Sequence, residues 1–258
     1  MLKRLFLGIY RDLQDQFYFQ EALGYNCVDA GFVPGITGRD TEMYVFRKLR
    51  KSGLWPIEEK IVNYSEEDLF DIIELVFDLI SKPIGGSYHQ YGNCGWHYST
   101  FDKKTGQSEF LNQINPQLND YTEGYELSPD GEILLKGGPG LHELLATEIP
   151  EYDPKNVNEK VKYAVLKFRR HRASTEEKKE AVRILADVLE FLRPEIRKLP
   201  LRKDEGELFH IANEFGIRHH KPGQKTEYDQ DVYLEWIFYS YLSTINLAIQ
   251  IIQSHQGS

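Results

Sequence analysis

The chain of 258 residues is long enough for one large domain or two modest ones, and its 41% hydrophobic and 28% charged residues are ordinary globular usage, so a packed core is expected. The net charge of -9 argues against a protein that coats nucleic acid, and the lack of an apolar run of about 18 residues argues against a membrane-spanning helix. With two cysteines and no secretory-signal pattern at the start, we expect a cytoplasmic protein without a disulfide framework and without membrane contact.

The first clear elements along the chain are two helices on either side of a turn. Upstream of them, residues 31–40 (GFVPGITGRD) are rich in turn residues and predict a loop. A helix is expected from Thr41 onward, with Gly53 as its stop. A stronger helix begins after Ser65, because Ser65 and Asp68 form a capping-box pattern ahead of apolar residues at helical spacing.

A segment rich in glycine and aromatic residues comes next. Residues 83–108 favour short strands or an ordered loop over a helix. Residues 109–121 predict a helix that is interrupted near Pro116. Residues 124–138 predict a hairpin, because two short apolar runs flank a Pro-Asp-Gly turn.

Beyond a polar connector at residues 151–160, the sequence becomes helical. Four segments place apolar residues on one helical face, at residues 157–171, 175–197, 204–217 and 231–253. Short connections between such helices favour an antiparallel four-helix bundle. We therefore expect a mostly helical α+β protein, with an irregular mixed domain over residues 1–150 and a helical bundle over residues 156–254.

Positive charge is concentrated in the first two helices of the expected bundle. Residues 156–203 hold 14 basic and 7 acidic residues, a net charge of +7. The basic run at residues 168–172 supplies Arg169, Arg170 and Arg172. These arginines could face RNA phosphates, or they could stabilise a helix C-terminus as part of a solvated surface, and both interpretations stay open.

The most unusual local sequence lies before the last expected helix, where an arginine precedes two adjacent histidines. A fixed cation beside groups that exchange protons near neutral pH could cut an RNA phosphodiester without a metal, with histidine as general acid or base and arginine on the phosphate. The predicted site consists of the catalytic residues Asn213, Arg218, His219 and His220 and the RNA-binding residues Lys221 and Lys225. The alternative is that these side chains satisfy helix-end carbonyls or neighbouring acids.

Several runs of residues carry a resemblance to a known group of proteins. They are FRRHRAS, AVRILADVLEFLRP, LFHIANEFGIRHHKPGQ and WIFYSYLSTI, with INPQLNDYTEGYELSPDGEILL upstream. The first four resemble the C-terminal half of bacterial proteins related to the AbiJ-type abortive-infection group, and the last looks like the N-terminal domains that precede such bundles. The helical layout, with an Arg-His element before the last helix, is similar to HEPN domains, many of which are metal-independent ribonucleases.

This resemblance implies an antiphage protein with a sensor-like N-terminal domain, RNA or a protein trigger as partner, and a homodimer formed through the C-terminal bundle. It assigns phosphate binding to Arg218, proton transfer to His219 or His220, and orientation of these groups to Asn213. In the usual HEPN motif the histidine stands further from the arginine than it does here. The chain therefore fits either a variant ribonuclease or a non-catalytic interaction module whose aromatic last helix docks a partner.

A second group of candidate ligands lies in the N-terminal half. His89, Cys94 and His97 fall within the run HQYGNCGWH, and the spacing of Cys94 and His97 suits zinc. Structural zinc sites usually take their ligands from two close pairs, whereas Cys27 stands alone in the sequence. We therefore expect a buried thiol and histidines packed on aromatic rings here, with no metal and no cofactor. The sequence contains no Walker loop, GxGxxG or Gly-x-Ser-x-Gly element.

Overall fold

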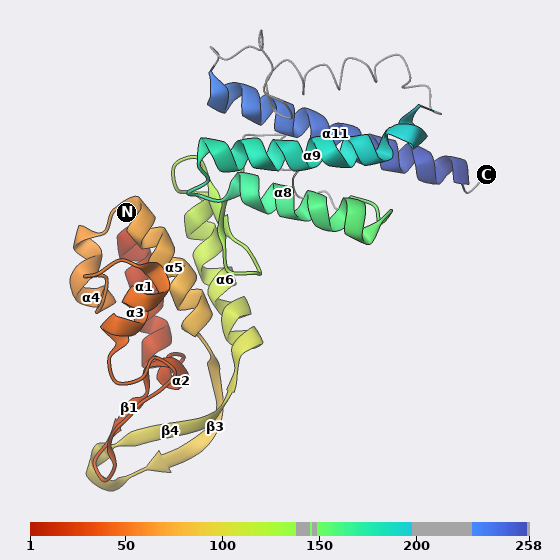
Figure 1. Ribbon diagram of the computed structural model, residues 1–258. Helices are drawn as coiled ribbons and strands as arrows, with labels where there is room; N and C mark the ends of the chain where they lie inside the picture. Colours follow the sequence, from red (N-terminus) through yellow and green to blue (C-terminus); the bar gives the residue numbers. More distant parts are fainter. Residues whose placement is uncertain (138–144, 146–148, 198–228, 257–258) are drawn as a thin grey trace. The chain divides into compact units, whose positions relative to one another are not determined.

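The computed structural model describes residues 1–137, 145, 149–197 and 229–256 (Figure 1). The chain divides into two compact units, Met1–Lys136 and Gly137–Ser258, and each has its own hydrophobic core. The division falls before the polar connector at residues 151–160, which belongs to the second unit. The expected α+β composition, dominated by helices, is confirmed.

Helices make up most of the first unit. They are α1 (Leu2–Asp15), α2 (Gln20–Leu23), α3 (Thr41–Leu49), α4 (Ile57–Lys60), α5 (Glu66–Leu79) and α6 (Lys103–Asn119), with the 3-10 turns η1 (Ile61–Asn63) and η2 (Tyr91–Asn93). The predicted capping box at the start of α5 is confirmed: the Ser65 hydroxyl accepts from the Asp68 N–H, and the Asp68 carboxylate accepts from the Ser65 N–H. The predicted interruption at Pro116 is wrong, because this proline lies in the last turn of α6, where its missing N–H removes a single backbone hydrogen bond.

The strands of the first unit form three separate antiparallel hairpins. The pairs are β1 (Tyr25–Cys27) with β2 (Gly31–Val33), β3 (Lys82–His89) with β4 (Gly95–Asp102), and β5 (Tyr125–Leu127) with β6 (Ile133–Leu135). The predicted strands within residues 83–108 are confirmed up to Asp102, where α6 takes over, and so is the Pro-Asp-Gly hairpin. The loop predicted at residues 31–40 is wrong at its start, because residues 31–33 pair with β1.

The core of the first unit is built from its helices and from β5 and β6. One face of α1 is buried at helical spacing, by Leu2, Phe6, Tyr10 and Leu13. α5 is buried along nearly its whole length. Among the described residues, β1, β2, β3 and β4 add no side chain to this core, and both of their hairpins extend away from the helices (Figure 1). These two hairpins therefore lie outside the hydrophobic core of the unit. β4 meets the helical part through the ring of Tyr98, whose centroid lies 5.6 Å from that of Phe17.

The second unit is helical where it is described. Its helices are α8 (Glu159–Arg169), which follows the π-helical turn η3 (Pro154–Asn158), α9 (Thr175–Ile196) and α11 (Gln230–Gln256). α8 and α9 form an antiparallel pair, and α11 packs against α9 and runs in the same direction as α9 (Figure 1). Phe168 of α8 stacks on Phe238 of α11, with the ring centroids 4.0 Å apart. Three of the four predicted helices are thus present, and the fourth, at residues 204–217, lies outside the described residues.

The helix predicted at residues 231–253 is confirmed, and it is the single helix α11. Of the aromatic residues of this helix that could dock a partner, Phe238, Tyr239 and Tyr241 are buried in the core of the unit, whereas half of the Trp236 surface is accessible. In the part of the chain that the structure describes, no helix combines the length and the apolar character needed to cross a membrane.

Candidate functional site

The residues predicted to cut RNA lie in a part of the chain that the structure does not describe. They are Asn213, Arg218, His219 and His220, together with Lys221 and Lys225. The described helices on either side are α9, which ends at Ile196, and α11, which begins at Gln230. The geometry of the second unit therefore bears on this site only through the helices that flank it.

The predicted basic cluster lies at the junction between α8 and α9. Arg170 caps the end of α8 and is exposed, and Arg172 is exposed in the turn that follows. Arg169 is buried instead, with 8% of its surface accessible. Burial raises the pKa of Tyr239 to about 12, although the charge of Arg169 acts to lower it, which places this arginine near α11. Of the three arginines, only Arg170 and Arg172 are therefore exposed at the surface.

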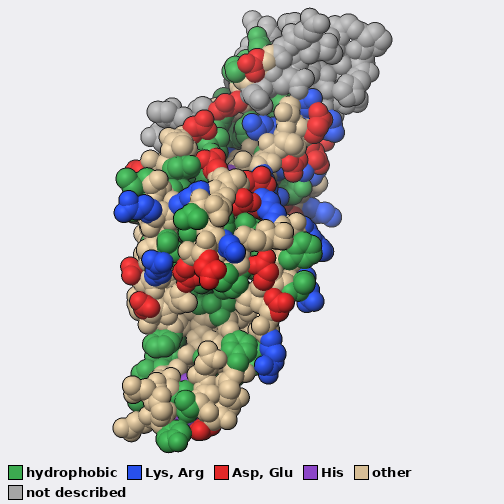
Figure 2. All heavy atoms as spheres, turned by 90° about the vertical axis from the view of Figure 1, so that its left-hand side faces the viewer, with side chains coloured by type: hydrophobic (Ala, Val, Ile, Leu, Met, Phe, Trp, Pro, Cys, Tyr) green, Lys and Arg blue, Asp and Glu red, His purple; other side chains and the backbone are tan. Residues whose placement is uncertain are grey.

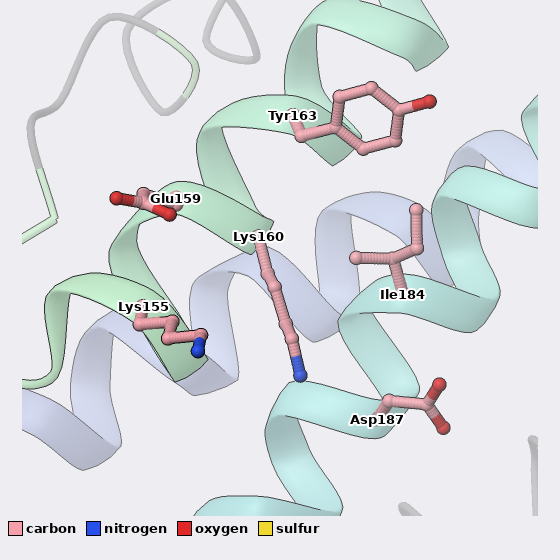
Figure 3. Close-up of a pocket in the computed structure, with 6 residues that line it drawn as sticks. All are labelled: Lys155, Glu159, Lys160, Tyr163, Ile184 and Asp187. Carbon is pink, nitrogen blue, oxygen red and sulfur yellow. The ribbon is translucent and has the colours of Figure 1, made fainter.

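A shallow hollow of about 260 Å³ lies between α8 and α9 (Figure 3). Its lining residues are Lys155, Glu159, Lys160, Tyr163, Ile184 and Asp187. The lysines and acids balance one another, and the Lys160 side chain extends across the hollow toward α9. The lining holds no histidine or cysteine, so it lacks a group that exchanges protons near neutral pH. We assign no chemistry to this hollow.

The first unit brings four soft or borderline metal ligands together at the ends of the β1–β2 and β3–β4 hairpins. Cys27 is the last residue of β1, and His89 is the last residue of β3. Cys94 closes the loop between β3 and β4, and His97 is the third residue of β4. One ligand atom from each of the four lies within 4.8 Å of the ligand atoms of the other three. All four side chains are half-buried.

The distances pair each sulfur with one imidazole nitrogen. The Cys94 Sγ lies 3.1 Å from the His97 Nε2, and the Cys27 Sγ lies 3.7 Å from the His89 Nδ1. The Cys94 Sγ also approaches the backbone carbonyl of Asn26, at 3.5 Å. The four ligand atoms therefore lie in one cluster, although they come from three separate segments of the chain.

Neighbouring groups orient both imidazole rings. The outer nitrogen of His89, Nε2, lies 3.3 Å from a carboxylate oxygen of Asp29, so the inner nitrogen is left to face the two sulfurs. The His97 ring stacks on Tyr25, with centroids 4.3 Å apart and planes 27° apart. Hydrogen bonds from the backbone of Ala30 and Asp29 lower the pKa of the Cys27 thiol, which favours the thiolate that binds metals.

Gln20 attaches β4 to the helical part of the unit beside this cluster. Its side-chain amide donates to the Trp96 carbonyl over 2.9 Å and accepts from the Tyr98 N–H over 2.6 Å. The turn between β1 and β2 meets the loop between β3 and β4 where Gly92 faces Val28: a Cβ added at Gly92 would lie 2.9 Å from a Val28 methyl carbon. The close approach of these loops is what places Cys27 beside the other three ligands.

The tertiary structure removes the reason for which no metal was expected at these residues. We expected no metal because Cys27 stands alone in the sequence, yet Cys27 lies at ligand distance from a cysteine and two histidines. The predicted packing of histidine on an aromatic ring is present at His97 and Tyr25. Comparisons with protein families, with curated protein sequences and with solved structures found no match to this chain.

Proposed function

We propose that this protein is a two-part abortive-infection protein in which the second unit is a HEPN-like bundle that cleaves RNA without a metal. The proposal rests on the resemblance of the runs between Phe168 and Ile251 to such proteins. The observation that supports it best is the arrangement of the helices on either side of the Arg-His element: α9 and α11 pack on one another and run in the same direction.

This arrangement is compatible with a fourth helix in the segment between α9 and α11, which lies outside the described residues. In a simple up-and-down bundle, helices that run in the same direction stand diagonally, so the direct contact of α9 and α11 departs from that arrangement. Two helices with the same direction still need a chain segment that returns from the end of the first to the start of the second. The predicted helix at residues 204–217 would supply that return. The Arg-His element would then stand between the return helix and the start of α11, which is its place in HEPN domains.

The proposed chemistry assigns one role to each residue of the element. Arg218 would hold the phosphate, His219 or His220 would remove the 2′-hydroxyl proton or protonate the leaving oxygen, and Asn213 would orient them. Lys221, Lys225 and the exposed Arg170 and Arg172 would attract the RNA backbone.

A homodimer through the C-terminal bundle is part of the same proposal. α11 keeps an accessible apolar stripe at Val232, Tyr233, Trp236 and Leu247. With 3.6 residues per turn, these four positions fall within about 100° of one another around the helix axis. A second copy of the chain would cover this stripe.

The test is RNA cleavage by the purified full chain in the presence of a chelator. We expect the wild type to cut RNA, and we expect at least a hundredfold loss for Arg218→Ala and for His219→Ala or His220→Ala. His255→Ala, a histidine change outside the element, serves as the matched control and should cut like the wild type. Circular dichroism checks that each variant keeps its helices.

Two results would decide against the assignment. If the triple alanine variant at residues 218–220 cuts RNA as fast as the wild type, the proposed site is wrong. If wild type cuts no RNA in the test tube, and its expression leaves growth and cellular RNA intact with and without phage, the non-catalytic interaction module is the better function. The exposed Trp236 on α11 favours that second candidate, since large exposed aromatic residues anchor protein interfaces.

A further inference from the structure

We propose that Cys27, His89, Cys94 and His97 bind one zinc ion, which joins the ends of the β1–β2 and β3–β4 hairpins. This site lies in the first unit and is independent of the proposed RNA cleavage by the second unit. Its test below measures metal content rather than activity, so either proposal can fail without the other.

The separations of the ligand atoms suit a tetrahedral zinc. With zinc at about 2.3 Å from sulfur and about 2.1 Å from nitrogen, a tetrahedral angle places sulfur and nitrogen about 3.6 Å apart. The two sulfur–nitrogen pairs lie 3.1 and 3.7 Å apart, and all the ligand atoms lie within 4.8 Å of one another. Small side-chain rotations would therefore bring all four atoms onto one ion.

The surroundings of His89 add an independent reason to expect a metal. A histidine that binds zinc through one nitrogen commonly donates its other N–H to a carboxylate, which sets the tautomer and the direction of the ring. Asp29 stands 3.3 Å from the His89 Nε2, on the side away from the sulfurs. Asp29 is therefore a positioning residue for His89 in this site.

The ends of the β1–β2 and β3–β4 hairpins also need stabilisation from outside the hydrophobic core. A two-stranded hairpin on its own is at best marginally stable in water. β1, β2, β3 and β4 add nothing to the described core of the unit, and Val28, Tyr88 and Tyr91 near the ends of the hairpins are more than half exposed. On the face shown in Figure 2, charged side chains are also sparse at the lower end, which these hairpins form. One ion held by both hairpins would supply the missing stabilisation.

The ligand set indicates both the metal and its role. Two thiolates and two imidazoles in a tetrahedral arrangement select zinc over magnesium or calcium, which prefer oxygen ligands. Four protein ligands fill the coordination sphere and leave no position for a water or a substrate. The site is therefore structural, and we expect it to hold the hairpins together rather than to catalyse a reaction.

The first experiment measures the metal in the full chain, purified without added metal and without a histidine tag. We expect about one zinc per chain by elemental analysis. After the zinc is removed under reducing conditions, Co²⁺ should restore the intense visible absorption of a tetrahedral cobalt–thiolate site, which added Zn²⁺ should abolish. A wild-type chain that holds no zinc and gives no such cobalt spectrum would overturn the proposal, as would a Cys27–Cys94 disulfide found in the freshly purified protein.

Substitutions of single residues test which side chains bind the ion. Cys94→Ser and His97→Gln should each lose most of the zinc, while Gln90→Ala, an exposed change in the same loop, should keep it. Asp29→Asn should still bind zinc. In competition with a chelator, its affinity for zinc should be about 10–100-fold lower than that of the wild type. If the ligand variants retain as much zinc as Gln90→Ala, the ion is bound elsewhere and the assignment is wrong. The cobalt spectrum of the wild type decides the matter even where a ligand variant does not fold.

Discussion

A substitution at Gly24 tests how the β1–β2 hairpin is held against the helices. Gly24 joins α2 to β1 with φ 79° and ψ -165°, a conformation that is nearly restricted to glycine. A Cβ at this position would lie 2.1 Å from the carbonyl oxygen of Val33 and 2.7 Å from the Gly35 nitrogen. Both are backbone atoms, which cannot rotate away as the end of a flexible side chain can. Gly24→Ala should therefore strain the backbone and separate β2 from its partner.

The expected loss follows from these two effects. A non-glycine residue in this region of φ and ψ costs about 1–3 kcal/mol. Overlap with fixed neighbours adds about 1–3 kcal/mol. The sum of roughly 2–6 kcal/mol is a large part of the 5–15 kcal/mol that stabilises a typical domain.

Gly38→Ala is the matched control. Gly38 has φ 77°, but a Cβ there would meet no atom within 4 Å, so only the cost of the left-handed conformation applies, about 1–2 kcal/mol. Urea denaturation of the full chain, followed by circular dichroism, measures both free energies of unfolding. If the two variants differ by less than about 0.5 kcal/mol, the close approach at Gly24 does not exist in solution. Because β1 carries Cys27, Gly24→Ala should also weaken zinc binding more than Gly38→Ala does.

Two further predictions concern charged groups in the first unit. Hydrogen bonds from Lys82, 2.5 Å away, and from Tyr18 lower the pKa of Glu109 below its ordinary value of 4.5, so this carboxylate stabilises the fold above about pH 4.5 and that contribution is lost as the pH falls further. Glu109→Gln should therefore lower the urea midpoint near pH 7 but not near pH 3, and an equal loss at both values would contradict the argument. Lys51 lies 2.9 Å from the carboxylate of Asp71, which is 1% exposed, so Lys51→Met should cost about 1–3 kcal/mol of unfolding free energy while Lys51→Arg costs less. Equal urea midpoints for these two variants would show that the charge of residue 51 is not what matters.

Local sequence predicted the elements whose partners lie within a few residues of one another. Both halves of the capping box of α5 come from Ser65 and Asp68, which are three positions apart. The hairpin of β5 and β6 follows from a turn whose residues are adjacent in the chain. The continuous α11 follows from a long apolar pattern without glycine or proline. These elements need no information from the rest of the fold.

The β1–β2 hairpin was missed for a physical reason. Each of its strands has three residues, and neither strand contributes to the core, so the sequence contains no alternation of buried and exposed positions. Its turn residues by themselves indicate a loop. The pairing depends on two glycines. A Cβ at Gly24 would meet the backbone of β2 at Val33, and a Cβ at Gly35 would meet the carbonyl oxygens of Glu21 and Ala22 in α2.

The candidate zinc site was also predicted only in part from local sequence. The sequence by itself grouped His89, Cys94 and His97, because they fall within one loop and the strands that flank it, but it left Cys27 apart and predicted no metal. Cys27 precedes His89 by 62 residues, and no local pattern connects them. Only the tertiary structure decided that Cys27 and His89 meet. The contact that brings them together, between the turn at Val28 and the loop at Gly92, depends on how the two hairpins pack against each other. Helix caps and turns depend on neighbours in the chain, whereas a metal site built from three segments depends on where the whole fold places them.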